Sequence, residues 1–174
     1  MWPAPRHSNT RTQGIVHVAD VSIETLLSTP TVTVRDVVFK GGASRSRAAE
    51  ATTETTHLVF PYRGVFVRHV GSDDVVGDAN QVLFFSAEER HCISHPAAGG
   101  DASLVLIIEK ALLHEMAPHV SVGEGEKLRF LIRRKRIDPR TQALVALLRH
   151  SLRAGLAEPL EGESLALTLA QRAL

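Results

Sequence analysis

Apolar and polar residues alternate over short runs through the first two thirds of the chain, and turn residues separate the runs. The run TVTVRDVVF at 31–39 puts Val32 and Val34 on one side of a strand. The runs HLVF, GVFVRHV, QVLFF and HCIS follow, separated by turn clusters such as GSDD at 71–74. SLVLII at 103–108 is continuously apolar, which is typical of a strand buried on both faces. Seven or so short strands with turns between them predict a β-sandwich or barrel.

The apolar period lengthens in the last third of the chain, which predicts helices. ALLHEMAPH is a candidate short helix that ends at Pro118. Asp138 followed by Pro139 is typical of an N-cap and first helical residue, so we expect a helix over 139–154, ended by Gly155. Leucines recur at helical spacing along it, at Leu144, Leu147, Leu148 and Leu152. A second helix is predicted from Pro159 onward.

Length, composition and charge limit the classes of protein to which the chain can belong. The chain has 174 residues, of which 44% are hydrophobic and 22% charged, so one folded domain with a helical appendage is expected. A net charge of +1 gives no general attraction to nucleic acid. The single cysteine, Cys92, cannot form an intramolecular disulfide, and the fold therefore needs no oxidising compartment.

The amino terminus carries no targeting signal that the sequence pattern reveals. Residues 1–14 lack the apolar stretch of a signal peptide and read as a mobile arm. No run of about 18 apolar residues is present. We therefore predict a cytoplasmic protein that does not engage a membrane.

Three segments resemble the N-terminal cupin-like sensor domain of AraC-type transcription regulators. They are RGVFVRHVG at 63–71, GDANQVLFF at 77–85 and SHPAAGGD at 94–101, and the HP..GGD spacing is the most specific of them. The resemblance implies a mainly β fold, a cupin-like double-stranded β-barrel (jelly roll) followed by two or three α-helices. It implies a sensor barrel over 15–110 and a helical dimerisation or relay segment over 111–174.

In regulators of this family a small-molecule effector bound in the barrel alters the packing of attached DNA-binding domains. The resemblance therefore implies a homodimer that is no enzyme, needs no cofactor, and contacts DNA only through a C-terminal helix-turn-helix domain. No such domain is present up to Leu174, so the chain reads as truncated before it.

Six residues are candidates for contact with a ligand, namely Arg63, Arg68, His69, His57, His91 and His95. If the Arg68 face of its strand lines the barrel, a guanidinium in an apolar cup would bind a carboxylate bidentately. An outward-reaching Arg68 is the favoured alternative. In the turn formed by Pro96, Gly99, Gly100 and Asp101, we expect positive φ angles at the glycines, a capping role for Asp101, and backbone hydrogen bonds from His95.

The metal pattern of metallo-cupins is missing, because the chain has no His-x-His. His91 and His95 share strand parity but lie about 13 Å apart on a regular strand, too far to bind one ion together. A metal site would have to assemble across strands from His57, His69, His91 or His95, and we predict none. The alternative function is a stand-alone metal-dependent cupin enzyme that uses such histidines with Glu50, Glu88 or Glu89.

Two further features are interpreted as structural. Alternation places His91, Ile93 and His95 on one side of their strand and Cys92 on the other, which favours a buried, inert cysteine over a reactive thiol. The basic run at 133–136 is interpreted as a solvated linker and not as a phosphate-binding patch.

Overall fold

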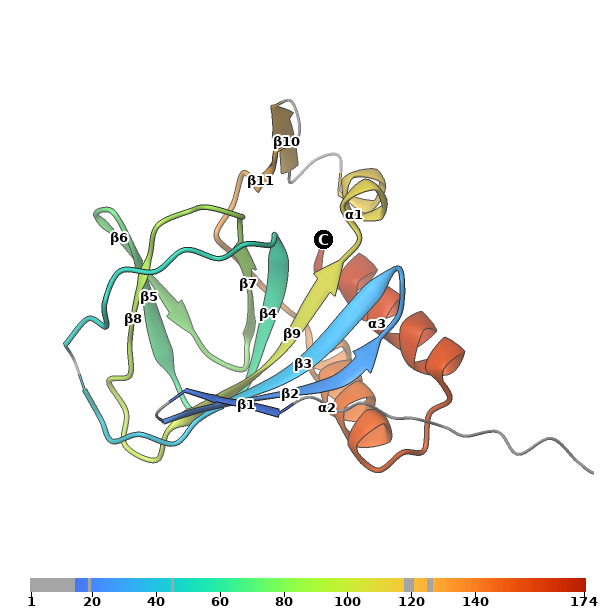
Figure 1. The fold of residues 1–174 in the computed structure, drawn as a ribbon, viewed down its shortest axis with the longest axis horizontal. Helices are drawn as coiled ribbons and strands as arrows, with labels where there is room; N and C mark the ends of the chain where they lie inside the picture. The colour runs from blue at the N-terminus through green and yellow to red at the C-terminus, as the bar shows by residue number, and fades with distance from the viewer. Residues whose placement is uncertain (1–14, 19, 45, 118–120, 125–126) are drawn as a thin grey trace, which may run out of the picture.

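Two β-sheets face each other across a barrel interior, and two long helices cover the outer face of the larger sheet (Figure 1). The structure is a computed structural model that describes residues 15–174 apart from 19, 45, 118–120 and 125–126, so the predicted arm at 1–14 lies outside the described residues. The larger sheet contains, in spatial order, β1 (Ile15–Val18), β2 (Val21–Ser28), β3 (Val32–Phe39), β9 (Asp101–Ile108), β4 (His57–Arg63), β7 (Gln81–Phe85) and β12 (Arg134–Arg136). The smaller sheet contains β6 (Asp73–Gly77), β5 (Phe66–Val70) and β8 (Cys92–Ser94). The predicted arrangement of a two-sheet barrel followed by helices is confirmed.

A β-hairpin and a short helix lie at one end of the barrel (Figure 1). The hairpin consists of β10 (Ser121–Glu124) and β11 (Lys127–Phe130), and the short helix is α1 (Lys110–Met116). The long helices are α2 (Pro139–Arg153) and α3 (Pro159–Ala173). No helix of the described residues is long and apolar enough to cross a membrane.

The predicted helix boundaries are confirmed. The Asp138 carboxylate accepts a hydrogen bond of 2.7 Å from the Thr141 backbone N–H, Pro139 is the first helical residue, and Gly155 has φ +68° just after the C-cap. Helix α1 begins after Glu109, whose carboxylate accepts from two backbone N–H groups of the first turn.

The basic run predicted as a linker forms an edge strand instead. Arg134–Arg136 pairs with β7 in antiparallel register, with Lys135 opposite Val82, and its side chains are exposed. Pairing satisfies the backbone N–H and C=O groups that a solvated linker would leave to water, while the charges discourage a further strand from adding to this edge.

The apolar side chains form two separate clusters on the two faces of the large sheet. On β9, Leu104 and Leu106 pack toward the helices, whereas Val105 faces the barrel interior. The helix-side cluster is large and includes residues of α2 and α3 such as Leu148 and Leu169. The interior cluster is small, and its buried members are Val59, Phe66, Val75, Leu83 and Phe85. Burial on both faces accounts for the continuous apolar run of β9.

A buried carboxylate on β3 binds helix α2 to the large sheet. Asp36 is only 2% exposed and accepts hydrogen bonds from the Tyr62 hydroxyl at 2.5 Å, Arg149 Nε at 3.0 Å and an Arg153 terminal nitrogen at 3.2 Å. Arg153 also pairs with Glu24 on β2 at 3.1 Å. Burial and the bond to Asp36 raise the pKa of Tyr62 to about 12. These five residues, the Asp36 cluster, connect α2 with β2, β3 and β4.

Asp36→Asn is expected to lower the free energy of unfolding by about 1–3 kcal/mol, because Tyr62 and two partly exposed guanidinium groups lose their hydrogen bonds to a buried carboxylate. Urea unfolding followed by circular dichroism measures the change. Asp20→Asn, at an exposed position, removes the same charge and is the matched control. Equal stability of the two variants would contradict the role given to the cluster.

Candidate functional site

A cavity of about 320 Å³ lies between the two sheets. Its walls are mainly apolar, and this barrel cavity is lined by Val21, Val37, Phe39, Ala48, Val59, Phe66, Phe85, Ile93, His95, Asp101, Ser103 and Val105. A concave, mostly apolar pocket with a few polar groups is the usual form of a small-molecule site. We therefore take the barrel cavity as the candidate site.

The polar groups of the cavity belong to three of its lining residues. His95 Nδ1 lies 2.5 Å from an Asp101 carboxylate oxygen, and the His95 ring stacks on Phe39 with the ring centres 3.6 Å apart. Burial raises the pKa of Asp101, although the hydrogen bond from His95 and the charge of exposed Arg63 oppose the rise. Among the described residues His95 Nε2 has no hydrogen-bond partner, and Ser103 adds a hydroxyl to the same cavity. This polar set suits a ligand that has one polar group on an apolar body.

The turn before β9 brings Asp101 to His95. Gly99 and Gly100 have φ of +93° and +71°, as predicted, and a Cβ on Gly100 would lie 2.1 Å from the Phe39 carbonyl oxygen. The expected partners are wrong in both cases, because among the described residues the hydrogen-bond partner of each side chain is the other and not a backbone group of the turn. Each side chain binds the other because the turn leads from the end of β8 to Asp101, which pairs with Phe39 at the end of β3, beside the His95 ring.

Three of the predicted ligand-contacting residues gather around Phe85 inside the barrel. The His57 ring stacks on Phe85 with centres 5.0 Å apart, and the His91 ring meets it edge-on at 5.2 Å. His57 Nδ1 lies 2.9 Å from the Thr55 carbonyl oxygen and His91 Nδ1 lies 3.0 Å from that of Glu89, so each of these nitrogens donates its proton. The third residue is Arg68, whose Cζ lies 3.8 Å from the Phe85 ring centre.

Arg68 points inward and is fully buried, so the outward orientation favoured from sequence is wrong. One terminal nitrogen donates to the Phe84 carbonyl oxygen at 2.8 Å, and the other donates to the Glu89 carboxylate at 2.6 Å. Burial lowers the pKa of Arg68, and the carboxylate of Glu89 opposes this effect. The carboxylate that the guanidinium binds is therefore one of the protein's own.

His69 lies on the opposite face of β5, away from the barrel cavity. Its Nδ1 lies 2.6 Å from Asp74 and its Nε2 lies 2.8 Å from the Ser94 hydroxyl. This is the order of groups in a Ser-His-Asp triad. However, Ser94 and His69 are buried and neither lines the barrel cavity, so we assign this network of described residues a role in stability.

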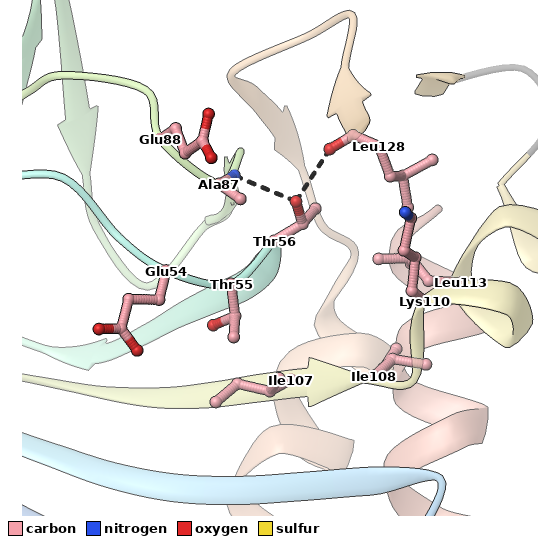
Figure 2. Close-up of a pocket in the computed structure, with 10 residues that line it drawn as sticks. All are labelled: Glu54, Thr55, Thr56, Ala87, Glu88, Ile107, Ile108, Lys110, Leu113 and Leu128. Atoms are coloured by element: carbon pink, nitrogen blue, oxygen red, sulfur yellow. Dashed lines mark hydrogen bonds between the residues drawn. The ribbon is translucent and has the colours of Figure 1, made fainter. Parts of the chain in front are cut away.

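A second hollow of about 410 Å³ lies at the end of the barrel, between the beginning of β4, the end of β9, helix α1 and β11 (Figure 2). The Thr56 hydroxyl organises it, accepting from the Ala87 N–H at 3.1 Å and donating to the Leu128 carbonyl at 2.9 Å. Glu88 and Lys110 line this hollow and not the barrel cavity.

The described residues do not assemble a metal centre. The four candidate histidines occupy three separate places, and no group of three His, Cys, Asp or Glu in the described parts of the chain could hold an ion. The three candidate carboxylates are also dispersed. Glu50 pairs with Arg90 at the surface, Glu88 lines the second hollow and Glu89 binds Arg68.

Comparisons with known proteins show similarity of fold alone. No family model and no curated protein matches the chain. AerE from Microcystis aeruginosa matches with a TM-score of 0.53 at 7% identity, over 72% of this chain and 52% of AerE. A cupin superfamily protein from Desulfitobacterium hafniense DCB-2 matches with a TM-score of 0.42 at 17% identity, over 53% of this chain and 81% of that one. The fold is cupin-like. Hydroxypropylphosphonic acid epoxidase from S. wedmorenis matches with a TM-score of 0.45 at 14% identity, over 56% of each chain.

Phe39 and Ser103 are cavity residues of the cupin-like barrel that sequence reasoning missed. Phe39 closes the run TVTVRDVVF on the parity of Val37, and Ser103 shares the parity of Val105. Strand parity was therefore a signal for both, but it does not say which face of a doubly buried strand meets the barrel.

The histidines near Phe85 make stability depend on pH. Burial lowers the pKa of His57 from 6.5 to about 4, so between these values the unfolded chain binds a proton that the folded barrel resists. Stability is thus expected to fall as the pH falls from about 6.5 to 4, by roughly 1–3 kcal/mol for this partly exposed ring. His57→Phe keeps a ring on Phe85 and should flatten that decline in urea unfolding at several pH values. His114→Phe, at an exposed position of α1, is the control and should leave the decline of stability with pH unchanged. If stability declines as steeply in His57→Phe as in the wild type, His57 is not the group responsible.

Proposed function

We propose that this chain is the effector-sensing and dimerising part of an AraC-type transcription regulator and that its barrel cavity binds a small, mainly apolar molecule. The cavity between the sheets, with apolar walls and the His95, Asp101 and Ser103 groups, is the observation that carries the proposal. The sequence resemblance supports the regulator, whereas the solved structures support the fold alone. In this proposal the domain binds and does not catalyse.

The path from ligand to helices runs through β3. Val37 and Phe39 line the cavity from one face of this strand, and Asp36 binds Arg149 and Arg153 of α2 from the other face. A ligand that favours one position of β3 also favours one packing of α2. Such a switch needs different affinities of the ligand for the two arrangements.

The DNA-binding step belongs, in this proposal, to helix-turn-helix domains of the protein beyond Leu174. The net charge of +1 fits a domain that does not itself bind the phosphate backbone. The cytoplasmic location stays a prediction.

Ligand binding can be tested with the neutral fluorescent probe N-phenyl-1-naphthylamine, whose emission rises in apolar sites. We expect saturable binding that Val37→Phe weakens about tenfold, because the added ring fills the cavity. Val76→Phe, on the exposed face of β6, is the matched control and should bind like the wild type. Absence of saturable binding, or equal binding by both variants, would reject the cavity as the sensor site.

We also propose a homodimer formed through the helical segment. Three large apolar side chains are exposed on α2, on α3 and in the turn between them, namely Leu147, Leu156 and Leu160, the last of them 79% exposed. Sedimentation equilibrium is expected to give twice the chain mass, and Leu160→Lys should shift the protein toward monomer by about tenfold or more in dissociation constant. Val76→Lys serves as the control. A wild-type monomer at high concentration would contradict the proposal.

A further inference from the structure

Arg68 is the largest fully buried side chain of the described residues, and its counter-charge comes from a loop. Glu89 lies between β7 and β8, and its side chain is 27% exposed. The other contacts of the guanidinium, the Phe84 carbonyl oxygen and the Phe85 ring, belong to strand β7. Of these three contacts, the charge partner alone comes from a loop and reaches solvent.

The hydrogen-bonding capacity of Arg68 is only partly used. A guanidinium has five N–H groups, and its Nε and one terminal nitrogen form a planar fork that a carboxylate can bind with two oxygens. Glu89 gives one oxygen to Arg68, and its other oxygen lies 3.4 Å from Arg133. Arg68 Nε is buried and has no hydrogen-bond partner, and the same holds for Arg133 Nε. One carboxylate is thus shared by two guanidinium groups, and the Nε of each remains unpaired.

Arg68 does not itself line the barrel cavity, but three of its neighbours do. Phe66 is the preceding inward residue on β5, Ile93 is the cross-strand partner of Arg68, and Phe85 lies under the guanidinium. All three of these neighbours line the cavity. A ligand group that displaced Glu89 from Arg68 would therefore lie beside side chains of the cavity.

We propose that Arg68 recognises a carboxylate on the molecule that the barrel binds, and that Glu89 holds this position in the free protein. The proposal rests on the proposed sensor function and names the ligand class, a small monocarboxylate with an apolar body. The ligand carboxylate replaces Glu89 and binds the fork at both Nε and a terminal nitrogen. The apolar body then lies against Phe66, Ile93 and Phe85.

Benzoate and benzamide are the probes, because they share a ring and differ in charge. Displacement of N-phenyl-1-naphthylamine, checked by calorimetry, is expected to show benzoate binding about tenfold more tightly than benzamide. Glu89→Gln removes the internal competitor and should strengthen benzoate binding about tenfold while leaving benzamide unchanged. Glu50→Gln removes an equal charge at an exposed site and should change neither affinity.

Arg68→Met should remove the preference for benzoate while the neutral fluorescent probe still binds. If this variant does not fold, the Glu89→Gln comparison decides alone. Equal binding of benzoate and benzamide, or no gain for benzoate in Glu89→Gln, overturns the carboxylate assignment and leaves the sensor function standing. If neither benzoate nor the neutral probe binds, both the carboxylate assignment and the proposed sensor function are overturned.

Discussion

The buried Asp36 carboxylate is the interaction on which the arrangement of sheet and helices depends. It lies among apolar residues where an unpaired charge would be strongly unfavourable, and a tyrosine hydroxyl with two arginines of α2 compensates it. Apolar packing alone would tolerate small shifts of α2 along the sheet. The directional bonds of Asp36 define one position, because each partner comes from a different place on β4 or α2.

The two faces of the large sheet differ: one packs against the helices and the other borders the barrel cavity. The helix-facing side has the larger cluster of buried apolar side chains, to which the sheet and both long helices contribute. The barrel side has a smaller buried cluster and leaves about 320 Å³ between the sheets. Strand β3 contributes side chains to both faces of the sheet, since alternate residues of a strand point to opposite faces. A molecule that contacts Val37 therefore acts on the strand that holds α2 through Asp36.

Polar groups inside the barrel depend on the loops for their partners. His57 bonds to Thr55 before β4, while His91 and Arg68 bond to Glu89 before β8. Each such partner offsets the desolvation of a polar group buried beside Phe85. The strands supply the apolar frame, and the short connections determine the chemistry of the interior. This division explains how a common fold can present different groups to a ligand.

The sequence by itself determined the strand and helix periods, the glycine turn at 99–100 and the start of α2 at Asp138. These features arise from neighbours within a few residues, so local pattern suffices to predict them. Only the tertiary structure decided that His95 binds Asp101, that Arg68 turns inward to Glu89 and that Asp36 holds α2. Each of these contacts joins separate elements, and its partner depends on sheet register and on which face of a doubly buried strand meets the barrel, which no short-range pattern encodes.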